Sequence, residues 1–102
     1  MPSEDKTILT SDEVDETLRA LAGWSRDGTI ISRDFVMANF KDITSFLNHL
    51  VKTITAMNHH PDFSLDTSSK TISVAVTTHS EKAVTRADVE FAHRLNAWQP
   101  GT

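Results

Sequence analysis

The stretch between Asn39 and Met57 places the strongest constraint on how this chain can fold. Its apolar residues recur at helical spacing, which predicts one long helix with a wide hydrophobic face. These residues are Phe40, Ile43, Phe46, Leu47, Leu50, Val51, Ile54 and Met57. A face of this width is typical of a helix that covers a β-sheet. We expect the helix to end near His59 or His60, because the residue before Pro61 is disfavoured in the α region.

Two β-hairpins are predicted, one on each side of this helix. The first pairs residues 24–26 with residues 29–37 around Asp27-Gly28, a dipeptide typical of a type I′ turn. The second crosses the turn sequence T-S-S-K. Its strands carry apolar residues in alternation, which is the pattern of strands with one buried face. These residues are Phe63, Leu65, Ile72, Val74 and Val76.

Two shorter helices complete the pattern. The first is predicted to begin at a capping box of Thr10 and Glu13 and to end at Gly23. The last is predicted to begin at Thr85, with Asp88 as its capping partner three residues later. The element order α-β-β-α-β-β-α predicts an α+β fold, with three helices packed on one face of a four-stranded antiparallel sheet.

Length and composition limit the chain to one domain. Its 102 residues, 38% of them hydrophobic, suffice for a single core, expected at residues 8–99. We expect a disordered N-terminus at residues 1–7 and a short tail at 100–102. The chain has no cysteine, no secretory pattern at its start and no apolar run of about 18 residues, so we expect a cytoplasmic protein without membrane contact. A net charge of -4 with scattered basic residues argues against direct nucleic-acid binding.

Three histidines are the strongest candidates for chemistry. His59 and His60 stand in M-N-H-H-P after the long helix, and His79 ends T-T-H after the later strand. Because a hairpin brings the end of its second strand back beside the start of its first, we expect the three rings within about 10 Å of one another. The C-terminus of the long helix would raise the pKa of the first two rings. Imidazoles titrate near neutral pH and suit general acid–base catalysis, although a solvated cap is the simpler reading of the adjacent pair.

Two other interpretations of the polar residues are open. The histidines could bind zinc with help from Asp62 or Asp88, as a metal-dependent hydrolase would require. Their spacing matches no common ligand motif, and adjacent histidines chelate one ion poorly, so we expect neither a metal nor a cofactor. Asp88 has a structural explanation as a helix cap. His49 and His93 are expected at the surface.

These residues together resemble the pterin-4a-carbinolamine dehydratases. The resemblance covers nearly the whole domain and rests on G-W after the first helix, M-N-H-H-P, T-T-H, and an aspartate that opens the last helix. It implies catalytic roles for His59, His60 and His79. It also implies substrate-binding or supporting roles for Asp88, Pro61 and Thr78.

The resemblance implies a specific reaction. A hydro-lyase of this family removes water from 4a-hydroxytetrahydropterin to give quinonoid dihydropterin, and so recycles the cofactor of aromatic amino-acid hydroxylases. The leaving oxygen must gain a proton while N5 loses one, which a protonated and a neutral imidazole can achieve together. We expect His60 to orient the pterin while His59 and His79 exchange protons. The resemblance also implies a homodimer or homotetramer. The alternative is a non-catalytic module of the same fold that dimerises and stabilises a partner such as a transcription-factor dimer.

Two positions depart from the family's pattern. Thr55 stands one helical turn before His59, where the family often has an acidic residue. The stretch D-T-S-S at residues 66–69 stands where the family favours an aromatic side chain. These differences predict reduced activity, or a retained fold without activity.

Overall fold

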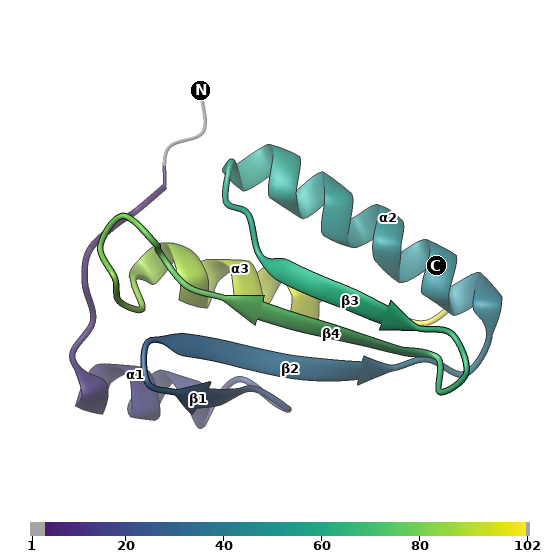
Figure 1. Ribbon diagram of the computed structural model, residues 1–102, viewed down its shortest axis with the longest axis horizontal. Coiled ribbons are helices and arrows are strands. Elements are labelled where there is room, and N and C mark those ends of the chain that lie inside the picture. The colour runs from purple at the N-terminus through teal and green to yellow at the C-terminus, as the bar shows by residue number, and fades with distance from the viewer. Residues whose placement is uncertain (1–3, 102) are drawn as a thin grey trace.

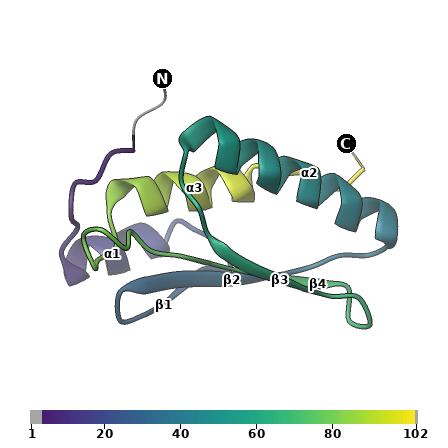
Figure 2. The ribbon, with the colours of Figure 1, turned by 45° about the horizontal axis from the view of Figure 1, so that its top comes forward.

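The computed structural model describes residues 4–101, with three helices and four strands in the predicted order. The helices are α1 (Ser11–Leu18), α2 (Phe40–Met57) and α3 (Arg86–Asn96). The strands are β1 (Ser25–Asp27), β2 (Ile30–Val36), β3 (Asp62–Asp66) and β4 (Thr71–Val76). They form one antiparallel sheet in the order β1-β2-β4-β3, and the helices lie on one of its faces (Figure 1 and Figure 2). The predicted α+β fold is confirmed.

The core lies between this face and the helices. Alternate side chains of a strand point to the same side, so β4 buries Ile72, Val74 and Val76 to 1% exposure or less. Phe46 of α2 and Phe91 of α3 meet the sheet with no exposed surface. Burying one such side chain contributes about 1.5–3 kcal/mol, so this layer holds the helices against the sheet.

Helix α2 begins where it was predicted to begin and ends earlier than predicted. The side chain of Asn39 accepts a hydrogen bond from the backbone of Asp42 at 2.8 Å. The helix ends at Met57 because Asn58 adopts the left-handed conformation, with φ 52° and ψ 39°. Asparagine tolerates that conformation better than most residues. The end predicted near His59 or His60 was therefore late, and both histidines lie in the connection to β3.

The first hairpin has a different turn from the predicted type I′ turn. Asp27 belongs to β1 and pairs with Ile30, so the two-residue loop is Gly28-Thr29. Gly28 has a φ of 60°, whereas Thr29 is not among the described residues with positive φ. A positive φ at only the first loop position is the pattern of a type II′ turn.

The region after α1 also differs from the prediction. The capping box of Thr10 and Glu13 is confirmed, with bonds of 3.1 Å and 2.9 Å between side chain and backbone. The helix then ends at Leu18, before Gly23, and the chain continues in tight turns. Gly23 has a φ of 85° at the entry to the first hairpin.

The N-terminal segment lies along the start of α3. Disorder was predicted for residues 1–7; residues 1–3 lie outside the described part, and residues 4–7 are held by hydrogen bonds. The carbonyl of Asp5 accepts from Ala87 N at 2.9 Å, and that of Thr7 accepts from Arg86 N at 3.1 Å. These donors lie in the first turn of α3, where no intrahelical partner exists. Across residues 4–101, no helix is long and apolar enough to cross a bilayer.

Candidate active site

The three predicted histidines line one pocket of about 300 Å³. His59 and His60 reach it from the connection after α2. His79 reaches it from the turn at residues 78–82, beyond the end of β4, where its carbonyl accepts from Lys82 N at 3.2 Å. The full lining is Glu4, Lys6, Asn58, His59, His60, Thr77, Thr78, His79 and Ser80. The pocket is therefore built from three segments that are distant in sequence.

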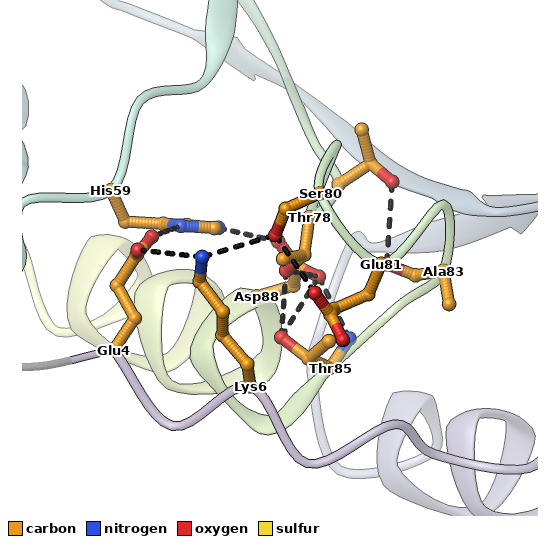
Figure 3. A network of polar contacts seen from close by, with 10 residues as sticks. Glu4, Lys6, His59, Thr78, Ser80, Glu81, Ala83, Thr85 and Asp88 are labelled. Atoms are coloured by element: carbon orange, nitrogen blue, oxygen red, sulfur yellow. Dashed lines mark hydrogen bonds and ion pairs between the residues drawn. The ribbon is translucent and has the colours of Figure 1, made fainter.

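His59 is buried between two carboxylates (Figure 3). Only 3% of it is exposed; its Nε2 lies 2.5 Å from Asp88 Oδ1, and its Nδ1 contacts Glu4 Oε1. Ionised carboxylates only accept hydrogen bonds, so a ring that bonds to both must donate from both nitrogens. Such a ring is the charged imidazolium, and it packs edge-on against Phe91, with centroids 5.9 Å apart.

The electrostatic environment of His59 supports this charge state. Burial alone lowers the pKa of His59, but the hydrogen bonds that the ring donates to Asp88 and Glu4, together with their negative charges, outweigh this effect. The net result is a pKa raised above the ordinary 6.5. For His59 the predicted direction is therefore correct, but the cause is a pair of carboxylates in place of the C-terminus of α2.

Asp88 supports His59 from inside the protein and is fully buried. Its Oδ2 accepts hydrogen bonds from Thr78 Oγ1 at 2.9 Å and from the backbone N–H of Thr85 at 2.8 Å. The second bond is the predicted cap of α3. Because Asp88 is fully buried, a substrate cannot reach its carboxylate, and neither Asp88 nor Pro61 is among the described residues that line the pocket. Thr78 lines it but is 3% exposed.

His60 and His79 are in a different environment. Both are exposed, and within residues 4–101 neither ring has a hydrogen-bond partner. Their nitrogens are therefore accessible to a molecule in the pocket. The pocket therefore has two kinds of imidazole: one that is buried and charged, and two that are exposed.

Two charged residues of the pocket were missed in the sequence. Glu4 and Lys6 come from the segment predicted to be disordered, and Lys6 Nζ donates to Ser80 Oγ at 3.0 Å and lies 3.8 Å from Glu4 Oε2. No periodicity or motif marks that polar segment. Thr55 takes no part in the pocket, because its hydroxyl is exposed and donates to the carbonyl of Val51 at 3.1 Å.

The polar groups outside this pocket are less suited to form a catalytic or metal-binding site. In the described part of the chain, no group of three or more histidine, aspartate or glutamate side chains is arranged to hold a metal ion. A larger groove of about 820 Å³ lies between α1 and α3, but His93 is its only imidazole. His49, expected at the surface, is half-buried and bonds the carbonyl of Arg94 at 2.6 Å. The smaller pocket is therefore the candidate active site, because three imidazoles converge on it.

Comparison with known proteins identifies the family of this chain. The profile of the family Pterin 4 alpha carbinolamine dehydratase matches residues 7–98. A Sulfurisphaera tokodaii protein, named provisionally as a pterin-4-alpha-carbinolamine dehydratase, is 35% identical over 86% of this chain and 92% of its own length. A Koribacter versatilis protein of the same name is 33% identical over 90% and 96%. A Brucella melitensis structure described as a transcriptional coactivator/pterin dehydratase shares 31% identity and a TM-score of 0.82, covering 89% of this chain and 97% of that one. With the fold, the histidine pocket and these relatives in agreement, the chain belongs to the pterin-4a-carbinolamine dehydratase family.

Proposed function

We propose that this protein removes water from 4a-hydroxytetrahydropterin and releases quinonoid dihydropterin, which returns the pterin to its recycling route in the cytoplasm. Family membership supports the substrate class. The observation that carries the proposal is that two exposed imidazoles border the same small pocket as a buried imidazolium. A volume of about 300 Å³ is at the lower end of the range for small-molecule sites and suits a bicyclic ring.

The reaction needs two proton transfers and no redox partner. The C4a–O bond breaks, the departing oxygen takes a proton and leaves as water, and N5 loses a proton as the C4a–N5 double bond forms. One neutral and one protonated imidazole can accept and deliver these protons, and the pair returns to its starting state after exchange with solvent.

The exposure of the rings assigns the roles in our proposal. His60 and His79 carry the two proton transfers, because their nitrogens are accessible from the pocket. His59 keeps a fixed positive charge at the pocket wall, because both its nitrogens are engaged by carboxylates. This assignment replaces the expectation that His60 orients the pterin while His59 exchanges protons. Asp88 and Thr78 position His59 from behind.

The function is tested by stopped-flow absorbance, with 4a-hydroxytetrahydropterin generated in situ. We expect dehydration faster than the spontaneous rate in proportion to protein concentration. His79→Ala should lose about 10²-fold in rate, the lower end of the effect of a general acid or base. The exposed His93 is the matched control, and His93→Ala should keep the full rate. An unchanged spontaneous rate in the presence of wild-type protein rules out the dehydratase.

A second part of the proposal concerns assembly. Strand β3 is a sheet edge with every residue exposed, including Phe63 at 46% and Leu65 at 38%. These two residues pair with Val74 and Ile72 of β4 and so lie on the helix-bearing face, beside unpaired backbone groups. An exposed apolar edge favours pairing with a second copy. We therefore include a homodimer or homotetramer in the proposal.

The same surface favours one alternative function. A non-catalytic module would use its apolar edge to hold a protein partner and would not need the histidines. The solved Brucella melitensis relative is described as a transcriptional coactivator as well as a pterin dehydratase. Substituting His59, His60 and His79 together separates the two functions, since a module without a pterin role keeps its partner binding and has no dehydration rate to lose.

A further inference from the structure

The N-terminal segment brings the carboxylate of Glu4 to the pocket, and among the described residues no other acidic side chain lines it. Helix α2 precedes the two histidines, yet its only acidic residue is Asp42, in its first turn and at the opposite end from His59. Thr55, in the last turn, is engaged with its own helix. Glu4 therefore provides the carboxylate on the solvent side of His59, opposite the buried Asp88.

The placement of Glu4 is determined by the backbone that follows it. The carbonyls of Asp5 and Thr7 accept hydrogen bonds from the first turn of α3, Ile8 pairs with Thr85 in an isolated bridge, and Leu9 N donates to Val84 at 3.1 Å. These contacts align the segment antiparallel to the chain that enters α3. Glu4 then extends over the pocket, and its side chain is 19% exposed.

A second contact connects this segment to the other wall of the pocket. Lys6 lies 3.8 Å from Glu4 and donates to Ser80, which follows His79 in the turn after β4 (Figure 3). Glu4 and Lys6 line the pocket together with His60 and His79. Residues 4–9, which we term the N-terminal strap, therefore contact the buried imidazole and the turn that carries an exposed one.

We propose that Glu4 is a positioning residue for the dehydration, holding His59 doubly protonated and oriented between two carboxylates while the strap forms one wall of the pocket. This inference rests on the proposed function for its catalytic consequence. It assigns a role to a segment in which the sequence shows no motif. The charged or titratable groups facing His59 are Glu4 from the strap, Asp88 from α3, and, around the pocket, Lys6, His60 and His79.

The direct test is the protonation of His59 in solution. The ring resonances of His59 are followed by NMR from pH 5 to 9 in wild type and in Glu4→Gln, with Glu90→Gln as a control that removes one exposed carboxylate from α3. We expect the pKa of His59 to fall by about one unit in Glu4→Gln and to stay unchanged in the control. An unchanged titration in Glu4→Gln overturns the inference, whether or not the protein is a dehydratase.

The catalytic part is tested by the pH dependence of kcat. In Glu4→Gln a larger share of His59 is neutral at high pH, so kcat should fall below wild type by up to about tenfold toward the alkaline end of the range and approach wild type toward the acid end. A merely structural defect lowers kcat by the same factor at every pH, and that result, or an unchanged kcat, overturns the positioning role. A lack of dehydration by wild type refutes the proposed function and leaves the NMR result to decide whether Glu4 holds His59. Matched melting curves confirm that the variants are folded.

Discussion

Asp88 Oδ1 lies 2.5 Å from His59 Nε2, and this contact joins α3 to a connection that precedes it by 29 positions in the chain. Both residues are almost or completely buried. The pair therefore has two consequences at once: it fixes one wall of the pocket and places a positive and a negative charge in the protein interior.

Removing the charge of Asp88 should destabilise the fold. In Asp88→Asn the imidazolium of His59 loses its buried partner, and breaking such a pair costs about 3 kcal/mol. Urea unfolding monitored by circular dichroism measures the difference. The exposed Glu90 provides the control, since Glu90→Gln should stay within about 0.5 kcal/mol of wild type. Equal stability of Asp88→Asn and wild type would show that the ion pair is not formed.

Stability should depend on pH through His59. Its pKa is higher in the folded protein than the ordinary 6.5, so folding favours the protonated ring. This contribution is fully present below pH 6.5, falls as the pH rises above 6.5, and is lost once the pH exceeds the folded-state pKa. Unfolding free energies from pH 6 to 9 should decline in wild type. The decline should be smaller in Asp88→Asn, and a flat profile in wild type contradicts the raised pKa.

Gly23 should be far less tolerant of a side chain than Gly28. Both have a positive φ, 85° and 60°, which costs an alanine about 1–2 kcal/mol. A Cβ at Gly23 would also lie 2.5 Å from Arg33 Nε, whereas a Cβ at Gly28 would meet nothing within 4 Å. Arg33 cannot retreat freely, because it stacks 4.3 Å above the Phe35 ring and bonds Asn96 at 2.7 Å.

We therefore expect Gly23→Ala to lose more unfolding free energy than Gly28→Ala by at least about 1 kcal/mol. Chemical denaturation of the two variants under identical conditions gives the comparison. Equal losses would mean that backbone strain alone governs both sites.

Charge on the β3 edge should disrupt the proposed assembly. Lysine at Phe63 or Leu65 places a positive charge on the exposed apolar edge and opposes strand pairing. Sedimentation velocity should show a smaller species for Phe63→Lys and Leu65→Lys than for wild type. Val36, which is 72% exposed but on inner strand β2, is the control, and Val36→Lys should not change the assembly. A wild-type protein that sediments as a monomer contradicts the assembly proposal.

The sequence was most informative where structure depends on neighbouring residues. The capping boxes at Thr10 and Asp88 involve contacts within three residues, and both were predicted from local sequence, as was the start of α2 at Asn39. The two hairpins followed from alternation and turn residues. Even the meeting of the three histidines could be anticipated, because a hairpin fixes where its own two ends lie.

The errors arose where distant contacts or backbone conformations decide the outcome. The end of α2 depends on the left-handed conformation of Asn58, which precedes the boundary that Pro61 suggested. The contact of Glu4 with His59 spans 55 positions and leaves no pattern in the sequence. The roles that we propose for the rings depend on burial, and of the two adjacent histidines His59 is buried and His60 exposed, because His59 turns toward α3.

The most direct measurement is a double-mutant cycle on the dehydration rate with His60→Ala, His79→Ala and the combined variant. If the two exposed rings carry the two proton transfers of one concerted step, each single substitution should lower kcat by about 10²-fold, and the double should be little slower than either single. Losses that multiply would show two independent contributions. Full activity in the double variant would contradict the assignment of the chemistry to this pocket.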